Sequence, residues 1–299
     1  LYMIVMLFGV ATMVFILTKL IPGDPAVANL GQRAMSNPEV VAAYRAKYGL
    51  DKPLIIQYFM YMGNLLHLDL GTSIRTNNEV LFELKRCFPA TIELALMSII
   101  LATIFGILFG IISAVRRNSI LDQGLRVISV TGVSIPSFWF ALLVLYFLYY
   151  KLQLFPGPGR LSNTFSAPET VTGLYVLDSL LEGNTAKAMD ALSHLILPSI
   201  VLAAFTMGLI TRTTRSNILD VMSTDYIRTA KAKGLSETGL ILKHALGNAL
   251  IPVLTVIGLG LGNLLGGMVL VETIFNWPGV GQFAYESVTA ADYPSIIGV

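Results

Sequence analysis

Charged residues are scarce in this sequence. They make up 13% of the 299 residues, whereas apolar residues make up 55%, and the mean hydropathy is +0.71. A water-soluble domain typically has about a quarter of its residues charged, so the composition excludes that class and predicts an integral membrane protein. The formal net charge is only +2, and no run of Lys and Arg is interleaved with aromatic residues, which argues against nucleic-acid binding.

Groups that carry chemistry are also few. The single cysteine, Cys87, cannot form an intrachain disulfide and is expected to be an ordinary buried thiol. The sequence contains no Gly-x-x-x-x-Gly-Lys-Ser/Thr loop with which to bind the phosphates of ATP. We therefore predict no catalytic residue and no metal site, and any energy for transport must come from another subunit.

Five apolar runs contain no Asp, Glu, Lys, Arg or His, and each approaches or exceeds the roughly 20 residues that a helix needs to cross a bilayer. They are 2–18, 94–115, 127–150, 195–211 and 250–271. The sequence therefore predicts an all-α, polytopic membrane protein. An ion-coupled carrier or an intramembrane enzyme would keep ionisable groups inside such helices, so both classes are disfavoured, whereas a passive channel stays open.

The orientation follows from the basic residues, because Lys and Arg near helix ends are retained in the cytoplasm. They concentrate in two connecting segments, 116–126 and 212–246. Both segments, and with them the N-terminus, are expected on the cytoplasmic side. The segments 22–89, 152–193 and 275–294 then face outward.

The first outer segment, 22–89, is more than a linker. It contains helix-like pieces at 37–47 and 53–66, separated by Gly and Asp/Lys turns, and is expected to form a small cap. In the second, a turn-rich stretch at 155–159 precedes an amphipathic run around 174–181.

The cytoplasmic segment 225–237 predicts a helix–turn–helix knob. Thr224 can cap a short helix with Asp225 at its positive end, Gly234 can end that helix in a left-handed turn, and Ser236 can cap the next one. Small side chains keep such a knob slim enough to enter a partner's cleft. A basic cytoplasmic loop with two short helices is also common without any docking role.

This segment resembles the EAA loop of the permease subunits of ABC importers. Arg228-Thr229-Ala230 stands where the Glu-Ala-Ala-like triplet is expected, and Gly234 takes the place of the glycine that follows it. The triplet is degraded, but the form found here is similar to that of the peptide/nickel branch. Three further matches follow the same order along the chain, at 20–25, 132–138 and 271–281.

The resemblance covers nearly the whole chain and is closest to the dipeptide type of the dipeptide, oligopeptide and nickel permeases. It implies a single permease domain over 1–299 with the type I ABC importer transmembrane fold, in which 212–246 is the cytoplasmic coupling loop. It also implies a sixth helix and a basic tail beyond Val299, so we expect the chain to be truncated. The residues assigned to ATPase coupling are Asp225, Tyr226, Arg228, Thr229, Ala230, Ala232, Lys233 and Gly234.

The resemblance implies the partners as well. These are a second homologous permease, two ATP-binding subunits that hold ATP and Mg²⁺, and an external substrate-binding protein, in a bacterial inner membrane. No cofactor is expected on this chain. The expected function is to form the import pathway for dipeptides or short oligopeptides. Nickel chelates or glutathione are alternatives, and a secondary transporter or channel is a more distant one.

Several residues within or beside the spans have two interpretations. Pro136 lies in the third span and either kinks a helix for packing or acts as a gating hinge. Gly106 and Gly110, and likewise Gly258, Gly262 and Gly266, form small-residue faces for helix packing. The ionisable residues at span ends are expected to contact interfacial water; they are Glu93, His194 and Glu272.

The outer segment after the fifth span combines aromatic residues with a tight turn. Phe275 and Trp277 fit an aromatic belt at headgroup depth. The turn-forming residues indicate instead a loop that folds back over the pathway mouth and forms an external gate. The residues assigned to it are Phe275, Asn276, Trp277, Pro278, Gly279 and Gly281.

Overall fold

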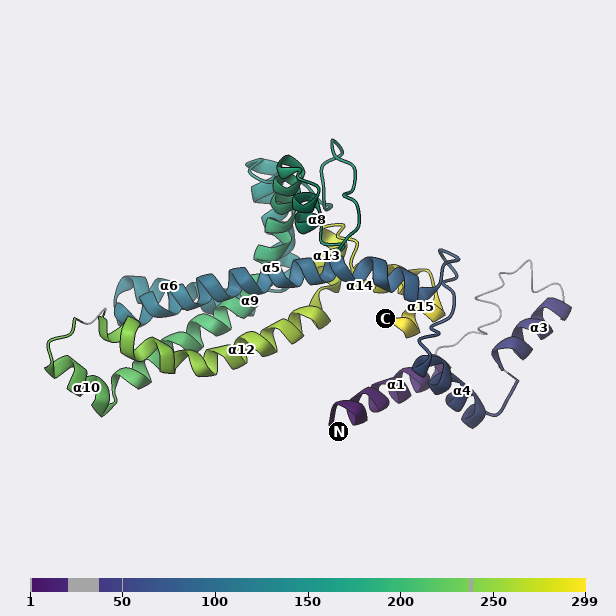
Figure 1. Ribbon diagram of the computed structural model, residues 1–299, viewed down its shortest axis with the longest axis horizontal. Helices are drawn as coiled ribbons and strands as arrows, with labels where there is room; N and C mark the ends of the chain where they lie inside the picture. The colour runs from purple at the N-terminus through teal and green to yellow at the C-terminus, as the bar shows by residue number, and fades with distance from the viewer. Residues whose placement is uncertain (1, 21–37, 50, 237–238) are drawn as a thin grey trace. The chain divides into compact units, whose positions relative to one another are not determined.

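The computed structural model describes residues 2–20, 38–49, 51–236 and 239–299 (Figure 1). The contacts divide the chain into two compact units, one formed by Leu1–Phe88 with Phe283–Val299 and the other by Pro89–Gln282. Within the described residues, all regular structure is helical except for one isolated bridge between Thr72 and Glu79. The predicted all-α fold is therefore confirmed.

The first unit contains helices α1 (Tyr2–Leu20), α3 (Pro38–Tyr48), α4 (Leu54–Leu66) and α15 (Tyr293–Gly298). The helix-like pieces expected in the outer cap correspond to α3 and α4, although Asn37 lies outside the described residues. Helix α4 packs on α1, with the hydroxyl oxygens of Thr12 and Tyr58 2.7 Å apart. Most of the apolar side chains of α1 stay exposed within this unit, as suits a helix whose outer face meets lipid.

A buried aspartate organises the end of this unit. The carboxylate of Asp292 caps α15 and accepts hydrogen bonds from the hydroxyls of Ser73 and Ser295 and from the backbone N–H of Ile74. It thereby joins two segments that are more than 200 residues apart in the sequence. Burial raises the pKa of Asp292, but these hydrogen bonds outweigh it and hold the pKa below its ordinary value.

The second unit contains the long helices. Its elements are α5 (Val80–Val115, from Pro89 onward), α6 (Ile120–Ser134), α7 (Ser137–Val144), the π-helix η1 (Leu145–Lys151), α8 (Tyr175–Leu181), α9 (Thr185–Met222), α10 (Asp225–Ala232), the π-helix η2 (Leu240–Ala245), α12 (Leu246–Gly267), α13 (Val269–Ile274) and the start of α14 (Val280–Thr289). Within this unit, Figure 1 shows α10 at one end and α8 with α13 at the other.

Helix α9 is the centre of this unit. Its 38 residues give it a length of about 57 Å, so it extends well beyond a hydrocarbon core of about 30 Å. Helices approach it at positions where no side chain fits: a Cβ on Gly132 of α6 would lie 2.7 Å from the Ala204 carbonyl oxygen, and one on Gly106 of α5 would lie 2.7 Å from Ile210. The packing role expected for Gly106 and Gly110 is thus observed.

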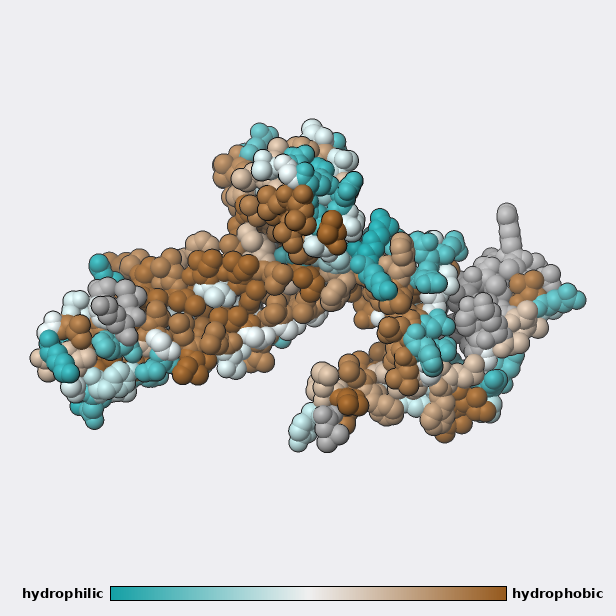
Figure 2. All heavy atoms as spheres, viewed as in Figure 1, coloured by the Kyte–Doolittle hydropathy of each residue, from teal (hydrophilic) through white to brown (hydrophobic). Residues whose placement is uncertain are grey.

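The predicted number of spans is only partly matched. Among the described residues, α5, α9 and α12 are long and apolar enough to cross a membrane, and α6 with the helix after its break could form a fourth, bent span. Helix α1 is apolar over the shorter stretch Tyr2–Leu17. Hydrophobic residues cover the body of the second unit, whereas hydrophilic ones gather around α10 and beside α8 (Figure 2).

The interpretation of Pro136 as a kink inside one helix is wrong. Helix α6 ends at Ser134 and α7 begins at Ser137, and the two helices are bent by 112°. Ile135 is extended (φ −76°, ψ 129°), because the ring of a proline disfavours helical conformation in the residue before it. The third apolar run is therefore broken into two helices here; a gating role for the break stays a prediction.

Candidate functional site

Helix α10 has the boundaries that the sequence predicted for the knob. It runs from Asp225 to Ala232, and Gly234 follows in the left-handed conformation (φ +85°). Thr224 occupies the N-cap position, but its hydroxyl donates to the Val221 carbonyl oxygen at 2.6 Å instead of capping the helix. Ser236 behaves as expected, since its hydroxyl oxygen accepts a hydrogen bond from Gly239 N–H.

The two faces of α10 differ sharply. Ile227 and Ala230 are buried and pack with Leu240 and Ala245 of η2 in a small hydrophobic core. The exposed face carries the other residues assigned to ATPase coupling, namely Asp225, Tyr226, Arg228, Thr229, Ala232, Lys233 and Gly234. Ala230 was assigned to the same contact, but it supports the knob from within and does not lie on its exposed face.

Tyr226 fastens the knob to the start of α12. Its hydroxyl accepts a hydrogen bond from the Asn248 carboxamide at 2.9 Å and donates one to the His244 carbonyl oxygen at 3.3 Å. A force on the exposed face of α10 therefore reaches α12 through Tyr226 and reaches α9 through the two-residue connection at Ser223 and Thr224.

An ion pair between the partly exposed Arg215 and the buried Asp122 joins α9 to the first turn of α6. Arg215 of α9 donates two hydrogen bonds, each 2.9 Å long, to the two carboxylate oxygens of Asp122. Asp122 is fully buried, and it also accepts hydrogen bonds from the Ser113 hydroxyl and from Asn118 N–H at 2.9 Å. A two-pronged contact of this kind fixes orientation as well as distance, so α9 and α6 are held as one body near the knob.

The predicted outer loop, 275–281, alternates between buried and exposed residues. The rings of Phe275 and Trp277 are buried, and the Trp277 indole N–H donates to the Ala90 carbonyl oxygen at 2.8 Å. Asn276 and Pro278 are exposed. Because the two rings point into the protein, the belt interpretation does not describe them, and the loop meets its surroundings through Asn276 and Pro278.

Glu272 of α13 precedes this loop, and the loop packs against its side chain. The expectation that Glu272 contacts interfacial water is therefore wrong. Its side chain is 0% exposed, and its carboxylate accepts hydrogen bonds from the Thr91 hydroxyl at 2.7 Å and from Gln282 N–H at 3.0 Å. The glycines of the loop pack against this carboxylate: a Cβ on Gly281 would lie 2.9 Å from it, and one on Gly279 would overlap it. The Gly-x-Gly pattern therefore makes room for Glu272.

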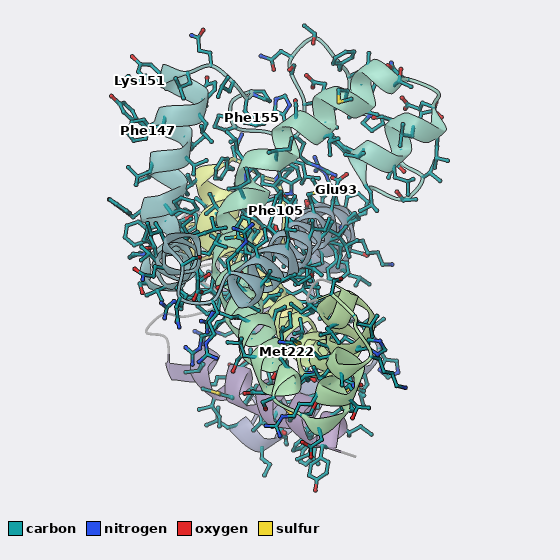
Figure 3. The ribbon with its side chains drawn as sticks, turned by 90° about the vertical axis from the view of Figure 1, so that its left-hand side faces the viewer. Glu93, Phe105, Phe147, Lys151, Phe155 and Met222 are labelled. Carbon is teal, nitrogen blue, oxygen red and sulfur yellow. The ribbon has the colours of Figure 1, made fainter. Side chains whose placement is uncertain are left out.

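Glu93 is also buried, and the expectation that it contacts water is wrong. Its carboxylate pairs with the Arg160 guanidinium and accepts a hydrogen bond from Val176 N–H at 2.9 Å. Figure 3 shows where Glu93 lies. The guanidinium carbon of Arg160 lies 3.5 Å from the centre of the Tyr175 ring and 5.4 Å from that of Trp277. Arg160 thus connects the segment after η1 to α5, to α8 and to the outer loop.

His194, the third residue expected to contact water, is buried on α9. Its Nδ1 lies 2.9 Å from the Asp190 carbonyl oxygen and 3.6 Å from the Asp190 carboxylate. Glu93 and Glu272 are enclosed because polar partners from distant parts of the chain meet them, whereas the partner of His194 is Asp190, four residues earlier on the same helix.

The second outer segment is held by Asp178 of α8. Its buried carboxylate accepts hydrogen bonds from the N–H groups of Thr172 and Gly173, at 2.9 Å and 2.8 Å, and from the Thr172 hydroxyl at 2.6 Å. Burial raises the pKa of Asp178, but these hydrogen bonds outweigh it and hold the pKa below its ordinary value.

Asp122, Arg160 and Asp178 organise the structure but were not predicted from the sequence. Arg160 had a visible signal, because it is the only Lys or Arg between Leu152 and Ala186 and directly follows a Pro-Gly-Pro-Gly run. Glu272 also had one, since an acid at the end of an apolar run precedes Gly-x-Gly by seven residues. The Asp122–Arg215 pair had none, because 93 residues separate its members.

Comparison with known proteins agrees with the resemblance. The family model described as "Binding-protein-dependent transport system inner membrane component" matches residues 106–299, and the model of the corresponding N-terminal part matches residues 1–95. The chain is 48% identical to the probable D,D-dipeptide transport system permease protein of Escherichia coli over 99% of its own length and 86% of that protein's. It is 44% identical to the di/tripeptide transport system permease protein of Pseudomonas aeruginosa, over 97% and 85%, and 39% identical to an oligopeptide transport system permease protein of Bacillus subtilis, over 98% and 86%.

Proposed function

Because this chain belongs to the family of binding-protein-dependent transport system inner membrane components, we propose that it forms the import pathway for dipeptides or short oligopeptides. As a family member it is an integral inner-membrane permease subunit that works with other transporter subunits, and ATP hydrolysis takes place in separate subunits. The names of three relatives, which specify dipeptides, di/tripeptides and oligopeptides, support peptides over nickel chelates or glutathione as cargo.

The proposed assembly has a second homologous permease, two ATP-binding subunits and an extracytoplasmic substrate-binding protein. ATP and Mg²⁺ are held by the ATP-binding subunits, and this chain holds no cofactor. The observation that carries the coupling proposal is the exposed face of α10, which presents Arg228, with Lys233 directly after the helix, while the opposite face of the helix packs against η2. We assign this face to the contact with an ATP-binding subunit.

Reconstitution tests this function. Vesicles that contain the complete transporter, with the binding protein and labelled peptide on one side and ATP on the other, should accumulate peptide only with ATP. Gly234→Trp should abolish uptake because it places a bulky ring on the docking face, whereas Gly234→Asn should keep most of it, since Asn tolerates positive φ. Uptake that needs no ATP, or equal uptake by both variants, contradicts the proposal.

We also propose that the N-terminus and α10 face the cytoplasm and that the segment 152–193 faces outward. In a Cys87→Ser chain, single cysteines at Thr229 and Ser166, both exposed, report the two sides. An impermeant thiol reagent added to intact cells should label Ser166→Cys only. Labelling of Thr229→Cys alone would reverse the orientation.

The loop 275–281 is proposed to form part of the external gate and to meet the docked binding protein. Its exposed residues are the ones to change: Asn276→Asp and Pro278→Ala should weaken the stimulation of ATP hydrolysis by the loaded binding protein and leave basal hydrolysis unchanged. The matched control is Thr289→Ala, another exposed change outside the loop. Equal stimulation in all three variants would remove the loop from the gate.

A further inference from the structure

A cavity of about 280 Å³ opens where α9, α12 and the broken third span meet. Three of its lining residues are polar: Ser137 at the start of α7, Thr206 on α9 and Asn263 on α12. The remaining lining residues are apolar side chains and a glycine, namely Ile135, Val201, Leu202, Phe205, Leu264 and Gly267. Its volume lies just below the range of about 300–1,000 Å³ that is typical of small-ligand sites.

Asn263 is the unusual residue of this cavity. It lies within the apolar run of α12, where a carboxamide is costly against lipid. Its side chain has no hydrogen-bond partner among the described residues. The residue is exposed, and it lines the cavity. Gly260 lies one turn before Asn263 on α12, and a Cβ there would lie 2.6 Å from Thr206 of α9. Because α12 contacts α9 this closely, Asn263 and Thr206 line the same cavity.

The chemistry of the lining matches a peptide main chain. A carboxamide both donates and accepts hydrogen bonds, and a peptide group presents one donor and one acceptor. None of the described residues that line the cavity is charged, so none of them selects a charged substrate side chain, while the apolar walls accept side chains of varied shape. Such a site suits a transporter of many different peptides.

We propose that this cavity binds the substrate's main chain during passage and that Asn263 hydrogen-bonds a peptide group of the cargo. The inference rests on the proposed function and identifies Asn263 as the residue that recognises the main chain, which all peptide substrates share. Ser137 and Thr206 supply hydroxyls on the facing walls. The position of Ser137, directly after the break at Pro136, makes the site sensitive to any movement of α7 relative to α6.

The test compares a dipeptide with the analogue in which an ester replaces its amide and so removes one N–H donor. Wild-type transporter, Asn263→Leu and the control Leu265→Ala, an exposed residue of α12 outside the cavity lining, are reconstituted with the same binding protein. Any discrimination that arises in the binding protein then cancels between variants. Wild type and Leu265→Ala should import the amide faster than the ester. In Asn263→Leu the rate of amide import should fall about fivefold, the factor that one neutral hydrogen bond supplies. The amide and the ester should then be imported by this variant at nearly the same rate.

Stimulated ATP hydrolysis and subunit co-purification are measured on the same samples. The proposal expects subunit co-purification to stay near wild type in Asn263→Leu and the ratio of peptide imported to ATP hydrolysed to fall. An unchanged amide-to-ester ratio in Asn263→Leu overturns it, and so does loss of subunit co-purification, which would place Asn263 in a contact between subunits. Absence of ATP-dependent uptake in the wild type would instead refute the proposed function itself.

Discussion

Gly279 lies against the carboxylate of Glu272 and leaves no space for a methyl group. Gly279→Ala must therefore displace either the loop or the carboxylate. Overpacking of this kind costs about 1–3 kcal/mol. If the carboxyl group moves away from Gln282 N–H or the Thr91 hydroxyl, each buried polar group left without its partner costs about 1–3 kcal/mol more. The expected destabilisation is about 3 kcal/mol or more.

The matched control is Gly258→Ala. Gly258 lies inside α12 with no atom within 4 Å of the position of an added Cβ, so the same methyl group should stabilise the isolated chain by about 0.5–1 kcal/mol through helix propensity. Thermal unfolding of both variants in detergent, followed by tryptophan fluorescence, measures the difference because Trp277 lies in the affected loop. Gly279→Ala should lower the melting temperature clearly, and Gly258→Ala should not. Equal melting of Gly279→Ala and wild type would refute the close packing around Glu272.

Two further predictions concern buried carboxylates. Arg215→Met should destabilise the chain by about 3–5 kcal/mol, because it leaves the buried Asp122 without its two-pronged partner. The control is Arg126→Met: the Arg126 side chain is 52% exposed and lies 3.6 Å from the same carboxylate, so its loss should change stability by less than about 1 kcal/mol. Chemical denaturation of both variants in detergent measures the two effects, and similar losses of stability would contradict the prediction. Asp178 has a lowered pKa in the folded state, so its ionised carboxylate stabilises the fold above the unfolded pKa of about 3.9, and this stabilisation is lost as pH falls from there through the folded pKa. The difference in stability between wild type and Asp178→Asn should therefore be largest at neutral pH and shrink in that acid range. A difference that does not change with pH would show that the ionised carboxylate does not stabilise the fold.

The sequence predicted features that depend on neighbouring residues. The apolar runs corresponding to α5, α9 and α12 were recognisable because a helix in a bilayer needs about 20 uncharged residues in a row. The limits of α10 followed from Asp225 at its start and Gly234 after its end, since capping and positive φ are local preferences.

Features that depend on distant partners could not be predicted in the same way. Glu272 appeared to be an interfacial acid, because its hydrogen-bond donor Thr91 lies 181 residues away. Glu93 was misjudged for the same reason, as its partner Arg160 lies 67 residues further along the chain. Ala230 was placed on the docking face because the partner of its buried face, η2, becomes clear only after the turn at Gly234 has been built.

The central claim is that the exposed face of α10 meets the ATP-binding subunit, and neighbouring positions on its two faces test this most directly. In a Cys87→Ser chain within the assembled transporter, Thr229→Cys and Ala232→Cys lie on the exposed face, and Ala230→Cys is buried. A short reagent that attaches to the cysteine thiol and carries a photoreactive group at its other end should cross-link the first two to the ATP-binding subunit and leave the third unlinked, with yields that change when ATP is added. Cross-linking from Ala230→Cys alone, or from none of the three while the complex stays intact, would contradict the claim.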